Sequence, residues 1–164
     1  MGQPKTKTAM VIRKADTDDL PSLIRLGREM HEEAPTFNML DFDDQKVIAL
    51  FNSPPMVESG ACFIAEDQGE AIGMFCGVVV PHYFGNMLMA NDLCLFVTKS
   101  RRGGTAAYRL IKTFESWALA KGAVSLRFGI STNVEPERTL KLYEKLGYKL
   151  EGYQVNKYHR GVEK

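Results

Sequence analysis

The sequence lacks the features by which membrane-spanning, secreted and charge-driven proteins are usually recognised. Its 164 residues contain no apolar run long enough to cross a bilayer. Residues 1–8 are polar and basic with no apolar segment behind them, which is unlike a secretory signal. The formal net charge is only +1, so bulk electrostatics gives no reason to expect nucleic acid or an anionic membrane as a partner. We therefore expect an ordinary globular protein.

Cysteine is also scarce in this chain. The three cysteines, Cys62, Cys76 and Cys94, are an odd number at wide spacings, which provides neither a disulfide framework nor the clustered ligands of a metal site. Each lies in an apolar, strand-like run, so we expect all of them to be reduced and buried. Reduced cysteines suit the cytoplasm, which is the location that we expect. No metal site is predicted.

Hydrophobic periodicity predicts one mixed α/β domain over residues 9–158, between short tails at residues 1–8 and 159–164. The first part of the domain is predicted as a strand, two helices and three antiparallel strands, in the order 9–14, 18–31, 41–52, 62–66, 71–80 and 87–97. The second part is predicted as a helix, a strand, a last helix and a final strand, with the outer bounds 104–121, 124–130, 136–146 and 148–158. Because a helical crossover joins them, the strands on either side of the long helix should be parallel.

The segment from Leu93 to Ala107 organises the chain. It reads as a buried strand, a turn with two arginines and two adjacent glycines, and the first turn of the long helix. Glycine allows a sharp turn and a close approach of ligand to backbone. The helix start presents free amides and a positive dipole end, so the segment predicts a site for a phosphate or diphosphate. It lacks the lysine and hydroxyl residue of a P-loop and the three spaced glycines of the dinucleotide fingerprint.

The pattern Arg101-x-x-Gly104-x-Ala106 resembles the coenzyme A loop of the GCN5-related N-acetyltransferase family. Further along, Leu142-Tyr143-Glu144-Lys145-Leu146-Gly147-Tyr148 resembles the helix end that is the second marker of that family. The resemblance covers roughly residues 9–158. It implies a central mixed sheet of about six or seven strands flanked by about four helices, with acetyl-CoA as the cofactor.

The resemblance also implies which groups hold the cofactor. The pantetheine arm would pair with strand main chain, as an added peptide strand would, at Leu95, Phe96 and Val97. The diphosphate would be cradled by the amides of the turn, at Arg102, Gly103, Gly104, Thr105 and Ala106. A charge-assisted contact would come from the side chain of Arg101 or Arg102. Relatives usually carry an asparagine seven residues before the tyrosine. Here that position is Pro136, so Asn133 is the nearest substitute at the helix start.

Tyr143 is the candidate general acid, because the family's tyrosine at this point often lies near the thioester sulfur. A phenol of pKa near 10 is close enough to a thiol of about 8.5 for proton transfer. The alternative is a tyrosine that only packs in the core.

The general base is harder to assign. Relatives often carry a glutamate where this chain has Asn91, and asparagine takes no proton. Asp92 is adjacent, but strand alternation directs it to the opposite face unless a bulge re-aims it. The alternative for Asp92 is a solubilising carboxylate or a substrate contact. His82, in an aromatic loop, titrates in the right range and is a further candidate.

The sequence therefore predicts an N-acetyltransferase that moves an acetyl group from acetyl-CoA to a primary amine of a small molecule or protein, in a ternary complex. Two alternatives stay open: a coenzyme-binding module without turnover, and an acyltransferase for longer acyl chains. The acidic residues of the first two helices suit a cationic acceptor, but they suit a solvated helix face equally well. The architecture permits a homodimer, for which no residue argues.

Overall fold

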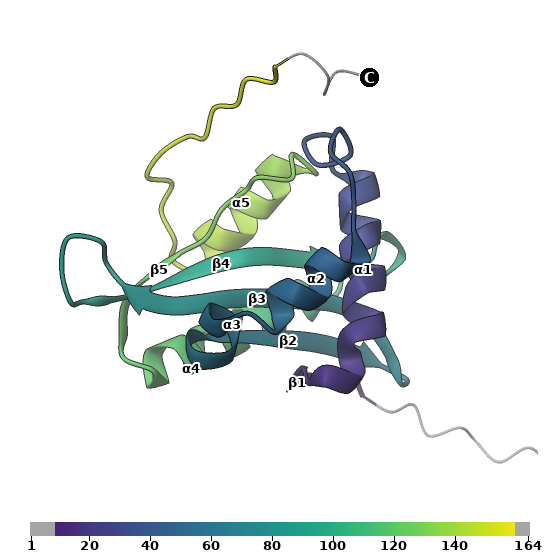
Figure 1. Ribbon diagram of the computed structural model, residues 1–164, viewed down its shortest axis with the longest axis horizontal. Coiled ribbons are helices and arrows are strands. Elements are labelled where there is room, and N and C mark those ends of the chain that lie inside the picture. Colours follow the sequence, from purple (N-terminus) through teal and green to yellow (C-terminus); the bar gives the residue numbers. More distant parts are fainter. Residues whose placement is uncertain (1–8, 160–164) are drawn as a thin grey trace, which may run out of the picture.

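The computed structural model describes residues 9–159 and arranges them as one mixed sheet with helices on both faces (Figure 1). The strands are β1 (Val11–Lys14), β2 (Gly60–Asp67), β3 (Glu70–Pro81), β4 (Leu88–Val97) and β5 (Ala123–Arg127). The α-helices are α1 (Leu20–Glu33), α2 (Asp44–Phe51), α3 (Pro54–Ser59), α4 (Ala106–Ala120) and α5 (Pro136–Lys145). The expected tail at residues 1–8, and all but the first residue of the expected tail at 159–164, lie outside the described residues.

The sheet has the order β1-β2-β3-β4-β5, with antiparallel pairs throughout except for the parallel pair β4–β5. This confirms the predicted mixed α/β class and the predicted parallel crossover. The pairing of β2 with β3 is closed by Gln68 and Gly69, which both have positive φ angles as a tight hairpin turn requires. Among the described helices, none is both long and apolar enough to span a bilayer.

The two faces of the sheet carry separate cores. On one face, α4 packs its apolar stripe on the strands through Leu110, Ile111 and Phe114, which are fully buried. On the other face, α1 covers the strands through Leu23 and Leu26. In Figure 1 the helices α1, α2 and α3 lie on one side of the sheet and α4 lies on the other. Helix α3 is an addition to the predicted elements, and it begins with Pro54 and Pro55, which the first helical turn accepts.

The predicted final strand over residues 148–158 is wrong, so the sheet has five strands where six or seven were expected. The segment contains strand-forming residues, but Tyr153 and Val155 are 91% and 92% exposed and belong to no strand. Strand β5 is short and leaves the sheet at Arg127, so its outer edge offers little length for pairing. The segment is anchored instead by Tyr158, whose hydroxyl donates to the carbonyl oxygen of Thr36 at 2.9 Å.

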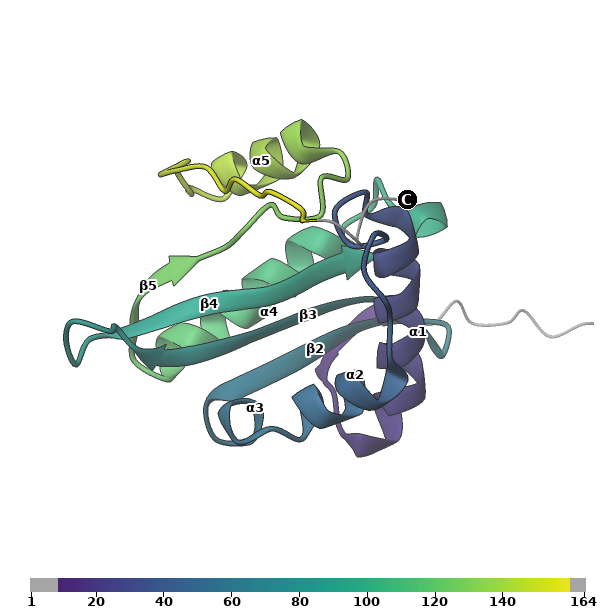
Figure 2. The same ribbon diagram turned by 45° about the horizontal axis from the view of Figure 1, so that its top comes forward.

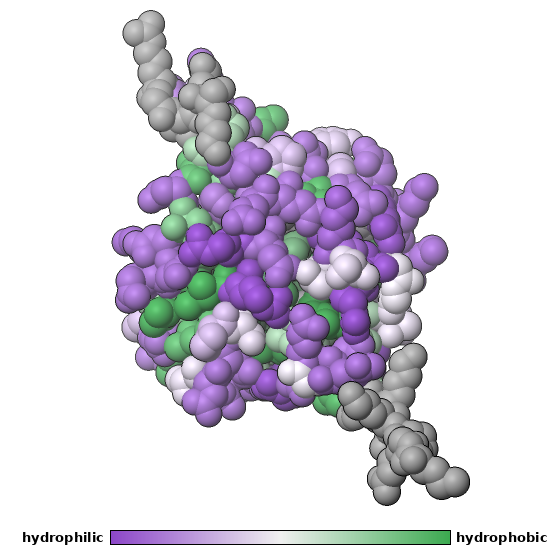
Figure 3. Space-filling view, turned by 90° about the vertical axis from the view of Figure 1, so that its right-hand side faces the viewer, coloured by the Kyte–Doolittle hydropathy of each residue, from purple (hydrophilic) through white to green (hydrophobic). Residues whose placement is uncertain are grey.

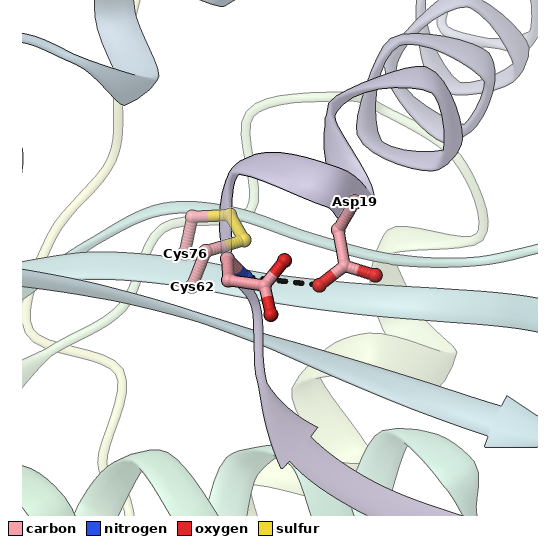
Figure 4. Close-up of a disulfide and its surroundings, with 4 residues drawn as sticks. Asp19, Cys62 and Cys76 are labelled. Atoms are coloured by element: carbon pink, nitrogen blue, oxygen red, sulfur yellow. Dashed lines mark hydrogen bonds between the residues drawn. A yellow bond between two sulfur atoms is a disulfide. The ribbon is translucent and has the colours of Figure 1, made fainter.

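The expectation that all three cysteines are reduced is also wrong. Cys62 and Cys76 form a disulfide between β2 and β3, close to the start of α1 (Figure 4). The two residues are direct partners in the antiparallel pairing, with Cα atoms 4.1 Å apart, a proximity that depends on hairpin register and not on spacing in the sequence. Cys94 remains a free thiol. The argument from reduced cysteines to a cytoplasmic location thereby loses most of its basis.

Candidate functional site

Strands β4 and β5 separate, and the main cavity lies where they part. Their pairing ends at Asn91 and Arg127, after which β4 continues to Val97 paired with β3 only, while the chain after β5 leads away toward α5 (Figure 2). A cavity of about 410 Å³ follows this free stretch of β4 and reaches the turn before α4 and the inner side of α5. The side of the molecule toward which β4 runs is mostly hydrophilic, with hydrophobic residues visible in hollows between polar ones (Figure 3).

The free stretch of β4 presents main-chain groups to the cavity at alternate residues. Thr98 donates its N–H to Ile72 of β3, so the main chain of Phe96, two residues earlier, also faces β3. The N–H and C=O groups of Leu95 and Val97 consequently point away from β3, toward the parted strands. Two of the three residues predicted to pair with a pantetheine arm thus offer backbone groups to the cavity. Phe96 lines the cavity with other atoms.

The turn after β4 presents a run of unpaired amides. No protein acceptor within residues 9–159 is bonded to the N–H groups of residues 103–108, and the first helical bond of α4 is the one from Arg109 to Thr105. Gly103 adopts a φ angle of +89°, which a residue with a side chain rarely accepts. Gly103, Gly104 and Ala106 line the cavity. The predicted anion site is thus a row of unpaired donors at a helix start.

The two arginines of the turn are both engaged with carboxylates on other elements. Arg101 forms an ion pair with Asp67 at the end of β2. Arg102 forms a bidentate pair with Glu33 of α1, at 2.6 and 2.5 Å, and its Nε donates to the carbonyl oxygen of Val97 at 2.8 Å. The Arg102 guanidinium holds the pKa of the Glu33 carboxyl below its ordinary value. Arg102 therefore fastens the turn to α1 and uses a donor on each of its three guanidinium nitrogens in doing so.

Asp92 reaches the cavity because of a bulge in β4. Cys76 of β3 pairs with Cys94, but the next residue, Gly77, pairs with Asp92, so Leu93 is an extra residue in β4. Without it, Asp92 would share the face of Cys94, which packs against α1. The extra residue turns Asp92 to the opposite face, where it lines the cavity and accepts the Gly129 N–H at 2.9 Å.

The surroundings of Asp92 favour its neutral form. Burial raises the pKa of its carboxyl to about 6, and the hydrogen bond from Gly129 offsets this only in part. A carboxyl with a pKa of about 6 is still ionised at neutral pH. It therefore combines a negative charge with the ability to hold a proton.

Tyr143 lies on the inner side of α5 and also lines the cavity. It is 4% exposed and packs against the rings of Phe128 and Tyr148. Burial, and after it the negative charge of Asp92, raises the pKa of its phenol above the ordinary value of 10. The two predicted catalytic residues are therefore brought to one cavity from a strand and a helix that are distant in the sequence. Tyr148, by contrast, donates its hydroxyl to Glu115 of α4 at 2.6 Å and serves packing.

Other candidate residues lie elsewhere. His82 is outside the cavity, in the loop between β3 and β4, where its Nδ1 accepts the N–H of Phe84 at 3.2 Å. Asn133 is exposed with a φ angle of +56° and does not line the cavity, although Thr132 and Val134 on either side of it do.

Two residues that the sequence did not nominate stand at the turn end of the cavity. Arg138 of α5 has Nη2 3.7 Å from the point where a Cβ on Gly103 would lie, so its guanidinium overhangs the turn. Glu135, just before α5, has a φ angle of +45° and accepts from Nη1 of Arg138 at 3.2 and 3.4 Å. Only the folding of α5 across the turn brings them there, and no local pattern signals it.

The family model and the solved structures described here that resemble this chain are all acetyltransferases. A family model described as an acetyltransferase (GNAT) domain matches residues 58–150. No curated protein matches the sequence. Among solved structures, the aminoglycoside N-acetyltransferase AAC(6')-Iy, in complex with a CoA-based bisubstrate analogue, superimposes with a TM-score of 0.73 at 22% identity, over 93% of this chain and 99% of that chain.

Two further structures have the same fold. A ribosomal-protein-alanine N-acetyltransferase from Brucella melitensis biovar Abortus 2308 matches with a TM-score of 0.71 at 17% identity, over 92% of this chain and 99% of that one. An aminoglycoside acetyltransferase from an uncultured soil metagenomic sample, in complex with sisomicin, matches at 0.70 and 19% identity, over 92% of this chain and 95% of that one. At such identities the likeness establishes the fold alone.

Proposed function

Since the chain belongs to the acetyltransferase (GNAT) family, whose domain model matches residues 58–150, we propose that it transfers an acetyl group from acetyl-CoA to a primary amine of a small molecule or protein. One observation carries the proposal: the free stretch of β4 leads directly into a turn with unpaired amides, along a single cavity. An extended arm that ends in a diphosphate matches this sequence of donors and acceptors.

The residues present fit acetyl-CoA. The outward-facing N–H and C=O of Leu95 and the N–H of Val97 can pair with a pantetheine arm, whereas the Val97 carbonyl oxygen already accepts from Arg102. The amides of Gly103 and Gly104 can bind the diphosphate. When bound, acetyl-CoA supplies an activated acetyl group with a thiolate as its leaving group. The remaining chemistry, which is to position the amine and to move protons, falls to side chains of the chain.

Asp92 is the proposed general base. Its carboxylate takes a proton from the attacking amine, directly or through one water molecule, which leaves the nitrogen lone pair free to attack. A base must be unprotonated to act, so the raised pKa of about 6 sets the pH above which Asp92 works. The bond from the Gly129 N–H holds one carboxylate oxygen and leaves the other for the amine.

Tyr143 is the proposed general acid. Its phenol donates a proton to the sulfur of the departing thiolate. Burial raises the pKa of the phenol, so the group stays protonated throughout the pH range in which Asp92 is ionised. At neutral pH the base Asp92 is therefore deprotonated and the acid Tyr143 is protonated, which are the states that the reaction requires.

The proposal specifies the acceptor substrate as a primary amine. The similar structures include enzymes named for aminoglycosides and for a ribosomal-protein alanine, two very different amines. Helix α1 has three glutamates beside a second, smaller pocket, and two of them are already paired, Glu29 with Arg25 and Glu33 with Arg102. These two paired carboxylates attract a polycationic acceptor less strongly than free carboxylates would.

Two measurements test the proposal. Thermal unfolding with coenzyme A should show stabilisation, since a ligand at 100 times its dissociation constant adds about 2.7 kcal/mol. Thiol release from acetyl-CoA should then depend on added amine across a panel of aminoglycosides, small alkylamines and peptides with free N-termini. Stabilisation without turnover on any amine would favour the binding module instead. Turnover with longer acyl-CoA in preference to acetyl-CoA would favour the longer-chain acyltransferase.

A further inference from the structure

The turn end of the cavity raises the question of which side chain meets a diphosphate there. The two arginines of the turn, Arg101 and Arg102, are both paired with carboxylates. Arg101 pairs with Asp67, on the β2–β3 hairpin. Arg102 uses Nε, Nη1 and Nη2 on Val97 and Glu33, and its side chain is only 18% exposed. Reorienting either guanidinium toward a phosphate would weaken its ion pair with a carboxylate.

Arg138 stands in a different position. Its Nη2 lies over Gly103, the residue whose positive φ angle shapes the turn, and its side chain is 56% exposed. Its only acidic partner among the described residues is Glu135, at 3.2 and 3.4 Å. Strong charge-assisted bonds between guanidinium and carboxylate measure about 2.7–2.9 Å, so this pairing is loose and exposed. Of the three arginines at the turn, Arg138 therefore has the ion pair that costs least to give up.

Glu135 completes the arrangement. Its left-handed backbone is unusual for a residue with a side chain, and its side chain caps no amide of α5. The carboxylate contacts Arg138 on one side and lies 4.0 Å from Arg102 on the other. A negative group thus stands between two guanidinium groups beside unpaired amides. A strained backbone that places an anion in such surroundings indicates a specific role.

We propose that Arg138 provides the side-chain contact to the diphosphate of the cofactor, and that Glu135 is an internal carboxylate that holds Arg138 at the turn until the diphosphate replaces it. This inference rests on the proposed function, because it assumes that the cavity binds coenzyme A. It replaces the predicted contact from Arg101 or Arg102 with one from the helix that carries Tyr143. It also makes Glu135 a competitor of the cofactor.

Calorimetric titration with two ligands tests the first half. Coenzyme A and dephospho-CoA share the diphosphate, and only coenzyme A has the 3′-phosphate. Arg138→Ala should weaken the binding of both about tenfold or more, and Arg138→Lys, which keeps the charge, should lose less. A loss confined to coenzyme A would assign Arg138 to the 3′-phosphate and overturn the proposal. Equal affinity of wild type and variant for both ligands would also overturn it.

A double-mutant cycle tests the second half. Glu135→Gln should tighten the binding of coenzyme A a few-fold, because the amide no longer competes for the guanidinium. The same change made on top of Arg138→Ala should bring no gain. Weaker or unchanged binding in Glu135→Gln alone, or an equal gain in both backgrounds, would refute the role of Glu135. Circular dichroism and thermal unfolding of each variant should match wild type, since both side chains are about half exposed.

Failure of the inference and failure of the proposed function give different results. Wild-type protein that binds neither coenzyme A nor dephospho-CoA would overturn the proposed cofactor, and this inference with it. Wild-type protein that binds both, together with an Arg138→Ala variant that binds them equally well, would overturn the inference alone.

Discussion

The two ends of the cavity are built in opposite ways. At the turn end, the groups available to a ligand are unpaired backbone amides of one contiguous segment, residues 103–108. At the other end they are the side chains of Asp92 and Tyr143, which come from a strand and a helix and meet only in the folded chain. The first end depends on main-chain conformation, while the second depends on the identity of individual side chains.

The electrostatics of the two ends differ in the same way. At the turn, positive side chains are neutralised by carboxylates, as in the bidentate pair of Arg102 with Glu33. At the other end, the ionisable groups are buried without a positive charge to stabilise their ionised forms. Burial raises the pKa of Asp92 to about 6 and that of the neighbouring Cys94 thiol to about 12. The capacity of the turn to hold an anion therefore rests on its unpaired amides, whereas the other end is suited to holding and releasing protons.

Loss of the Tyr143 hydroxyl should produce the largest effect. Tyr143→Phe keeps the ring against Phe128 but removes the proton donor, so kcat should fall by about a hundredfold or more with the KM for acetyl-CoA little changed. Steady-state kinetics with the best acceptor measures both constants. The matched control is Tyr148→Phe, which loses its bond to Glu115 and should lose stability rather than kcat. Full turnover in Tyr143→Phe would exclude this residue as the acid.

Asp92→Asn should lower activity next. The amide keeps an oxygen for the Gly129 N–H but takes no proton, so kcat/KM at pH 8 should drop by about ten- to a hundredfold. In wild type the rate should rise through a pH of about 6 as Asp92 ionises, and this limb should disappear in the variant. His82→Asn, at a histidine outside the cavity, is the control and should keep the limb. If the rise in rate through a pH of about 6 persists in Asp92→Asn but disappears in His82→Asn, then His82 and not Asp92 is the general base.

The same substitution should stabilise the protein. The pKa of Asp92 is raised from 3.8 to about 6 on folding, so the folded state binds this proton more tightly than the unfolded state. The free energy of unfolding should therefore decrease as the pH rises from about 4 to about 6, by up to about 3 kcal/mol, and stay lower above that range.

Urea unfolding at two pH values measures how much the buried, ionised carboxylate of Asp92 lowers the free energy of unfolding. Asp92→Asn should be more stable than wild type at pH 8 by about 1–3 kcal/mol, with little difference at pH 4. A variant that is less stable than wild type at pH 8 would mean that the carboxylate is held by favourable contacts and that its pKa is not raised.

Local sequence predicts the turn end well, because the features that make it are contiguous. The adjacent glycines, the helix start and the preceding apolar strand predict an anion site from Arg101 to Ala106 without knowledge of any distant residue. The partners of the arginines are not predictable in this way. Asp67 and Glu33 reach them from other elements, and the overhang of Arg138 depends on how α5 crosses the turn.

The other end shows why sequence reasoning is weaker where contacts are distant. The extra residue at Leu93 decides which face Asp92 occupies, and nothing in its neighbours marks a bulge. The disulfide between Cys62 and Cys76 likewise depends on hairpin register. The apolar residues spread over 148–158 fit a strand, yet a strand also needs a neighbouring edge, which the short β5 does not supply.

The smallest expected effects separate the shape of the turn from its clearance for the ligand. Gly103 has a φ angle of +89°, whereas a Cβ on Gly104 would meet nothing closer than the Arg101 carbonyl oxygen at 4.0 Å. Gly103→Ala should therefore lower the free energy of unfolding by about 1 kcal/mol, a shift in Tm of about 2–4 °C, and weaken coenzyme A binding by distorting the amides.

Gly104→Ala should leave the free energy of unfolding within about 0.5 kcal/mol of wild type. It should still weaken coenzyme A binding, because its methyl group occupies the space that a diphosphate needs at the backbone. Wild-type affinity in Gly104→Ala would show that the diphosphate binds elsewhere, and the turn would then be a structural element only.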